Sequence, residues 1–119
     1  RIQGRPVLGL RYVSRAKSTL LNIGKRESVA YVNGEQARLL RQMGRFDDAI
    51  ASASQGIDIA SAVGNPWLES ALWRELGRCY NAAGRGSDAA TAYGNAKELP
   101  VNKNPRGYRA TGPPGEVIR

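Results

Sequence analysis

The sequence predicts an all-α protein built from paired helices, and three observations lead to this prediction. Apolar and small residues recur at intervals of three, four and seven through the middle of the chain, which is the spacing of one helix face. Gly or Gly-Asn-Pro steps interrupt these stretches at residues 44, 64–66 and 84, where helices are expected to end and begin. One stretch also repeats forty positions later, and repeats of this length are typical of helical solenoids.

The repeat is clearest around two Gly-Arg steps. Residues 44–49 read G-R-F-D-D-A and residues 84–89 read G-R-G-S-D-A, so four of the six positions are identical. Positions before these steps also match in character, since Ala37 aligns with Gly77 and Leu40 with Tyr80. Each copy therefore predicts one helix before its Gly-Arg step and a second helix after it.

Local signals set the expected ends of these helices. Gly44 and its counterpart Gly84 are expected to end the first helix of each copy, because glycine readily takes the left-handed conformation found there. Asn65 is expected to cap the third helix, with Pro66 at its first position, where the missing N–H has no intrahelical partner. Ser87 is the expected cap of the fourth helix. The four expected helices cover residues 28–43, 46–63, 66–83 and 87–99.

Basic arms are expected on both sides of the repeats. The 119-residue chain carries a net charge of +8, distributed as +7 over residues 1–26, −2 over 27–99 and +3 over 100–119. The first arm, over residues 1–26, is expected to be extended apart from a helix over about 11–23. The last twenty residues are rich in Asn, Gly and Pro, which predicts an extended tail. A mildly acidic body with basic arms is thus the expected organisation.

The second copy resembles the tetratricopeptide repeat (TPR) family, whose unit is a helix–turn–helix. The residues that carry the resemblance are Trp73, Leu76, Gly77, Tyr80, Gly84, Ala89, Tyr93, Ala96 and Pro100. The first copy, over about 33–60, follows the same pattern less closely, and the spacing of forty exceeds the usual ~34. The resemblance implies a solenoid of two hairpins over residues 27–99, with the preceding helix docked on it.

The sequence disfavours an enzyme. There are no histidines and there is one cysteine, which excludes histidine-based metal sites, Ser-His-Asp triads and Cys-His dyads. Cys79 is interpreted as a small core residue. The adjacent Asp47 and Asp48 are interpreted as favourable charges at the start of a helix rather than as a catalytic pair. No cofactor or metal is expected.

The resemblance implies a peptide-binding groove lined by the first helix of each pair. Arginines three or four residues apart share a helix face, and guanidinium groups bind carboxylates in bidentate fashion. The alternative is a solvated face on which Glu35 and Glu75 balance the charge locally. The residues expected in the groove are Arg38, Arg41, Gln42, Arg74, Arg78 and Asn81.

Three kinds of partner are open for the basic arms: an acidic protein surface, RNA phosphates and an anionic membrane surface. The protein is not expected to be transmembrane itself, because no run approaches the ~18–20 apolar residues of a membrane span. The residues expected to make these contacts are Arg5, Arg11, Arg15, Lys17, Arg106 and Arg109.

These features together predict a non-catalytic protein-binding module. We expect a small accessory or scaffolding subunit that docks with other protein subunits in a larger multiprotein complex inside the cell. The arginine-rich, acid-free start has the composition of an organelle transit peptide, which favours a mitochondrion or chloroplast. The alternatives are an RNA-contacting subunit of an organellar ribosome or RNA particle, and a fragment of a longer TPR regulator.

Overall fold

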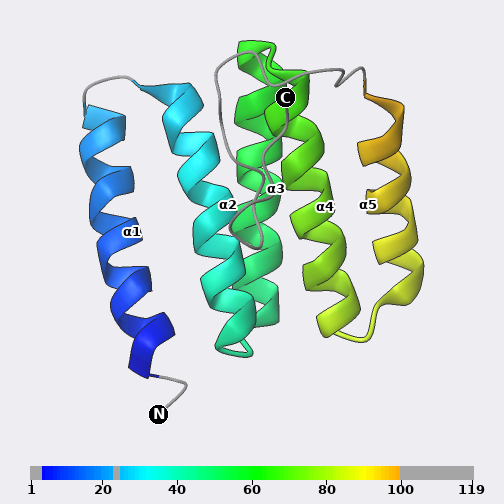
Figure 1. The fold of residues 1–119 in the computed structure, drawn as a ribbon, viewed down its shortest axis with the longest axis horizontal. Coiled ribbons are helices and arrows are strands. Elements are labelled where there is room, and N and C mark those ends of the chain that lie inside the picture. Colours follow the sequence, from blue (N-terminus) through cyan, green and yellow to red (C-terminus); the bar gives the residue numbers. More distant parts are fainter. Residues whose placement is uncertain (1–3, 23–24, 100–119) are drawn as a thin grey trace.

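The computed structural model describes residues 4–22 and 25–99, and within these residues every regular element is an α-helix (Figure 1). The prediction of an all-α fold is confirmed. The helices are α1 (Gly4–Asn22), α2 (Arg26–Gln42), α3 (Phe46–Val63), α4 (Pro66–Ala82) and α5 (Gly86–Glu98).

The helices form a left-to-right series of antiparallel neighbours, α1 to α5, in which two hairpins can be followed in Figure 1. Helix α2 packs on α3, and α4 packs on α5. The hairpins join through α3, which packs against α4, and through a direct contact of α2 with α4. Helix α1 packs against α2. Helices α2 and α4, which are the first helix of each hairpin, therefore lie side by side.

The forty-residue period is visible in the helix bounds themselves. Helix α4 begins and ends forty positions after α2, and α5 begins forty positions after α3. Gly44 and Gly84 follow the first helix of each hairpin with φ of 78° and 77°, a conformation that glycine adopts without steric cost. The side chain of Asn65 accepts a 3.0 Å hydrogen bond from the backbone N–H of Leu68, which confirms the expected cap of α4.

Two expected helix starts are corrected by the structure. Helix α5 begins at Gly86 rather than after Ser87, and its N-cap residue is Arg85, which makes no side-chain capping hydrogen bond. Helix α1 begins at Gly4 and not near Arg11, so most of the segment expected as an extended arm is helical. Proline at residue 6 is compatible with this start, because a first-turn proline breaks no intrahelical hydrogen bond.

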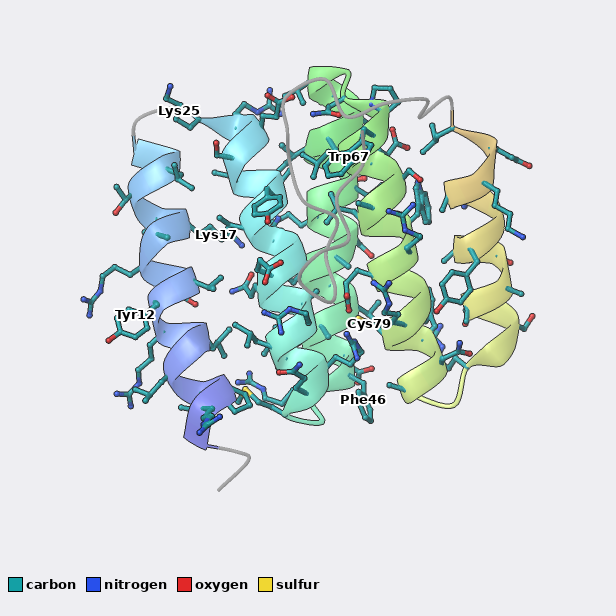
Figure 2. The ribbon with its side chains drawn as sticks, viewed as in Figure 1. Tyr12, Lys17, Lys25, Phe46, Trp67 and Cys79 are labelled. Carbon is teal, nitrogen blue, oxygen red and sulfur yellow. The ribbon has the colours of Figure 1, made fainter. Side chains whose placement is uncertain are left out.

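Small residues bring the helices close together in the core. At Gly77, a Cβ atom would lie 2.7 Å from ring atoms of Tyr93, so the aromatic ring of α5 fills the space that a side chain on α4 would need. At Gly56, a Cβ atom would lie 3.1 Å from the Cβ of Asn33. Trp67 is the largest fully buried side chain of the described residues and lies at the end of the bundle where α3 passes to α4 (Figure 2).

The predicted tail, with Arg106 and Arg109, lies outside the described residues. Within 4–22 and 25–99, no helix combines the length and apolar character that crossing a membrane requires.

Candidate binding surface on α2 and α4

The surface shared by α2 and α4 contains the six residues expected in the groove. Because α2 and α4 lie side by side, their arginines are brought onto neighbouring helices. Arg38 and Arg41 on α2 are half-buried, as are Arg74 and Arg78 on α4, whereas Gln42 and Asn81 are exposed near the C-terminal ends of these helices. We call the four arginines and the carboxylates that they contact the α2–α4 face.

A buried carboxylate lies at the centre of the α2–α4 face. The side chain of Glu75 is 0% exposed. Nε of Arg41 donates to its Oε2 at 2.8 Å, and Nη1 of Arg78 donates to its Oε1 at 3.4 Å. One carboxylate thus links α2 to α4. A buried charge is tolerated only when it is paired and hydrogen-bonded, so Arg41 and Arg78 are needed first of all to hold Glu75.

The pairing of glutamate with arginine is itself part of the repeat. Glu35 and Arg38 lie forty positions before Glu75 and Arg78, and Nη2 of Arg38 contacts Oε1 of Glu35 at 2.7 Å. In the first copy the pair is half-exposed, whereas in the second copy the carboxylate is buried. The alternative of local charge balance therefore describes part of this surface correctly.

The α2–α4 face carries four guanidinium groups that are held in place. Glu35 pairs with Arg38, and Glu75 pairs with both Arg41 and Arg78. Burial alone would lower the pKa of Arg41, but the hydrogen bond and negative charge of Glu75 outweigh burial and raise the pKa overall. Nη1 of Arg74 donates to the hydroxyl of Ser70 at 3.2 Å. The face can therefore attract an anionic group while its arginines are held in fixed positions.

Cys79 is buried beside the same carboxylate. Its Sγ donates to Oε2 of Glu75 at 3.5 Å. Burial, followed by the negative charge and the hydrogen bond of Glu75, raises the pKa of Cys79 to about 12. Since the thiolate is the nucleophile in thiol chemistry, this cysteine is a protonated core residue at neutral pH.

We expect Cys79 to resist thiol reagents in the folded protein. At pH 7 the native chain should react with iodoacetamide far more slowly than the chain in denaturing urea, because the native thiol is both buried and protonated. The measurement is the labelled fraction against time by mass spectrometry. Equal rates in both conditions would contradict the burial of the thiol.

Lys17 lies on the inner side of α1 rather than among the outward basic residues. Its Nζ donates to Oε1 of Gln36 at 3.3 Å and to Oε1 of Gln55 at 3.1 Å, and burial lowers its pKa. Ser52 also donates to Gln36, at 2.8 Å. Lys17 thus joins α1 to α2 and α3, and its expected role in partner contacts stays a prediction. Its position four residues after Val13 and three before Leu20, on the apolar face, was the sequence signal.

Arg5, Arg11 and Arg15 are exposed on α1, as expected of residues available to a partner. Among the described residues, no group of His, Cys, Asp and Glu is arranged to hold a metal ion. Comparisons of the chain with protein-family models, with curated proteins and with solved structures find no match.

Proposed function

We propose that this chain is a non-catalytic protein–protein interaction module that binds an acidic segment of a partner on the α2–α4 face. The observation that carries the proposal is the placement of α2 and α4 side by side, with four arginines on them, three of which are fixed by the carboxylates of Glu35 and Glu75. A carboxylate-rich peptide lying across α2 and α4 would find guanidinium groups already held in place, which reduces the entropy lost on binding.

The TPR resemblance agrees with this use of the surface. Three features of the structure support the resemblance. The helices form antiparallel hairpins, the helices of the second hairpin begin forty residues after those of the first, and the glycine at position 77 lets α4 pack closely against α5. In that arrangement the chain acts by holding other proteins. We therefore propose a small accessory or scaffolding subunit of a larger assembly, and an organelle as its place of action.

Replacing Arg38 and Arg74 tests the surface without removing the partners of Glu75. The double variant Arg38→Gln/Arg74→Gln should weaken partner binding by about tenfold or more, because one charged hydrogen bond contributes ~1.5–3 kcal/mol. The measurement is a pull-down from the source cell with nuclease treatment, followed by quantitative mass spectrometry and titration of the recovered partner. Circular dichroism and thermal melting check that the variant remains folded.

The matched control is Arg45→Gln/Arg85→Gln. These two arginines are also forty positions apart and each pairs with an aspartate three residues later, but they lie in the turns after α2 and α4. The control has the same net charge as the test variant and should retain the partners. Equal losses in the two variants, or partners that disappear with nuclease treatment in the wild type, would overturn the proposal in favour of non-specific charge or RNA binding.

A further inference from the structure

Helix α1 occupies the place of a second helix in the forty-residue repeat. Gly9 of α1, Ala49 of α3 and Ala89 of α5 are spaced by forty residues. Helix α1 packs on α2 as α3 packs on α4. The period therefore extends back through α1, which stands to α2 as α3 stands to α4.

One position in this series has a very different exposure in α1. Tyr12 is 69% exposed, whereas its counterparts forty and eighty positions later, Ser52 and Ala92, are 7% and 1% exposed. One turn further along, Ala16 is exposed while its counterparts Gly56 and Ala96 are buried. A side of the helix that is covered in α3 and α5 is thus open in α1.

In α3, the corresponding side is covered by α2, the first helix of the same hairpin. Ser52 donates from its hydroxyl to the backbone carbonyl of Asn33 in α2 at 3.0 Å. Gly56 lies so close to α2 that a Cβ atom there would be 3.2 Å from the carbonyl oxygen of Ala30. Among the described residues, no helix covers this side of α1, since α1 packs on α2 and reaches α3 only from its inner side, through Lys17 and Gln55.

The open side of α1 is apolar along its middle and positive along its edges. Leu8 is 55% exposed and lies one turn before Tyr12, with Ala16 one turn after it, and Figure 2 shows Tyr12 pointing away from α2. Arg5 and Arg15 are exposed beside this stripe. Helix α1 contains no acidic residue. We call these five residues the outer face of α1.

We propose that the outer face of α1 binds an amphipathic α-helix of a partner protein, with an apolar stripe flanked by carboxylates, in the position that α2 takes on α3. The apolar stripe of the partner would cover Leu8 and Tyr12, and its carboxylates would lie against the arginines at the edges. Charge complementarity of this kind favours the correct partner and speeds association. This surface is separate from the α2–α4 face, and the inference does not depend on the proposed function.

The small side chain of Ala16 favours a helix over other anionic partners. Its counterparts Gly56 and Ala96 are also small, and at Gly56 the reason is the close approach of another helix backbone. A lipid surface or a nucleic acid does not require a small residue at this point. A second copy of α1 is disfavoured as the occupant, because its outer face carries the same positive charge.

The test uses the full chain carrying Arg38→Gln/Arg74→Gln, so that the α2–α4 face does not compete for acidic peptides, and three synthetic peptides of about 20 residues, enough for roughly five helical turns. The first consists of Leu, Ala and Glu with its apolar residues at helical spacing. The second has the same composition in scrambled order, and the third has Lys in place of Glu. Fluorescence anisotropy should show binding of the first peptide, and binding of the other two that is weaker by about tenfold or more.

Substitutions on exposed residues locate the binding. Tyr12→Ser gives α1 the residue that its counterpart in α3 already carries, and it should weaken binding of the acidic helix by about tenfold. The matched control is Val63→Ser, which removes an exposed apolar side chain from α3 and should leave binding unchanged. The double variant Arg5→Glu/Arg15→Glu should shift the preference to the Lys peptide, a reversal that loss of folding cannot produce.

Several results would overturn the inference. Equal binding of the scrambled peptide would show that charge alone acts, and equal weakening by Val63→Ser would show that α1 is not the site. The same titrations include phosphatidylserine vesicles and a single-stranded RNA oligonucleotide. If either binds in a manner that Tyr12→Ser abolishes while the acidic peptide does not bind, the outer face of α1 is a lipid or RNA surface instead.

Discussion

Replacing Trp67 with alanine should lower the free energy of unfolding by about 3–5 kcal/mol, the usual cost of removing a large buried aromatic side chain. Trp67 is 1% exposed and belongs to the cluster of buried residues that includes Leu68 and Leu72. It lies in the first turn of α4, where three helices converge near the α3–α4 turn. A cavity there should not collapse readily, because the Gly64-Asn65-Pro66 turn fixes the start of the helix.

The measurement is urea denaturation followed by circular dichroism at 222 nm, which does not depend on the substituted fluorophore. Trp73→Ala is the control on the same helix, since Trp73 is only half-buried and its indole N–H donates to Glu69 at 3.2 Å. The control should lose clearly less stability. A Trp67 variant as stable as the wild type would contradict the packing of this end of the bundle.

The helices of the repeats were predictable because their boundaries depend on local chemistry. Gly44 and Gly84 end the first helices through their own left-handed conformation, and Asn65 caps α4 with its own side chain. These signals act within one turn of helix, so the helix ends can be predicted from the local sequence alone. The cap predicted at Ser87 was wrong by two residues, since Gly-Arg-Gly-Ser offers several equivalent starts for α5.

Other features depend on neighbours that the local sequence does not specify. The helix before the repeats was expected to begin near Arg11, but α1 already contains Gly9, where a Cβ atom would lie 3.3 Å from Leu39 of α2, so the missing side chain serves helix packing. The repeated aromatic pattern drew attention to Trp73, whereas the buried tryptophan is Trp67. Its burial follows from the convergence of α2, α3 and α4 and not from a position in the repeat.

The residues expected in the groove remain a predicted binding site, and the contacts among them were not predicted. Arg38, Arg41, Arg74 and Arg78 do lie on two adjacent helices. The full burial of Glu75 could not be predicted from a helix in which charged residues normally face water. Since Arg41 comes from the other hairpin, the repeat unit alone does not contain the pair. The contact therefore requires the placement of α2 against α4.

Replacing Arg41 with methionine should lower the free energy of unfolding by about 3 kcal/mol. The substitution leaves Glu75 buried with a 3.4 Å contact to Arg78 and a 3.5 Å contact to the thiol of Cys79. Removing one partner of a buried ion pair costs ~3–5 kcal/mol because the other charge remains uncompensated, and the partial exposure of Arg41 places this case at the lower end. Urea denaturation at pH 7 measures the loss.

The decisive control is the double variant Arg41→Met/Glu75→Leu. Replacing a buried ion pair with apolar residues of similar volume is often neutral, so the double variant should regain most of the stability lost by Arg41→Met. Arg45→Met, which breaks an exposed pair with Asp48, should cost less than ~1 kcal/mol. If the double variant were less stable than Arg41→Met, the penalty would arise from lost packing of the arginine stem, and Glu75 would not be the charge that joins the two hairpins.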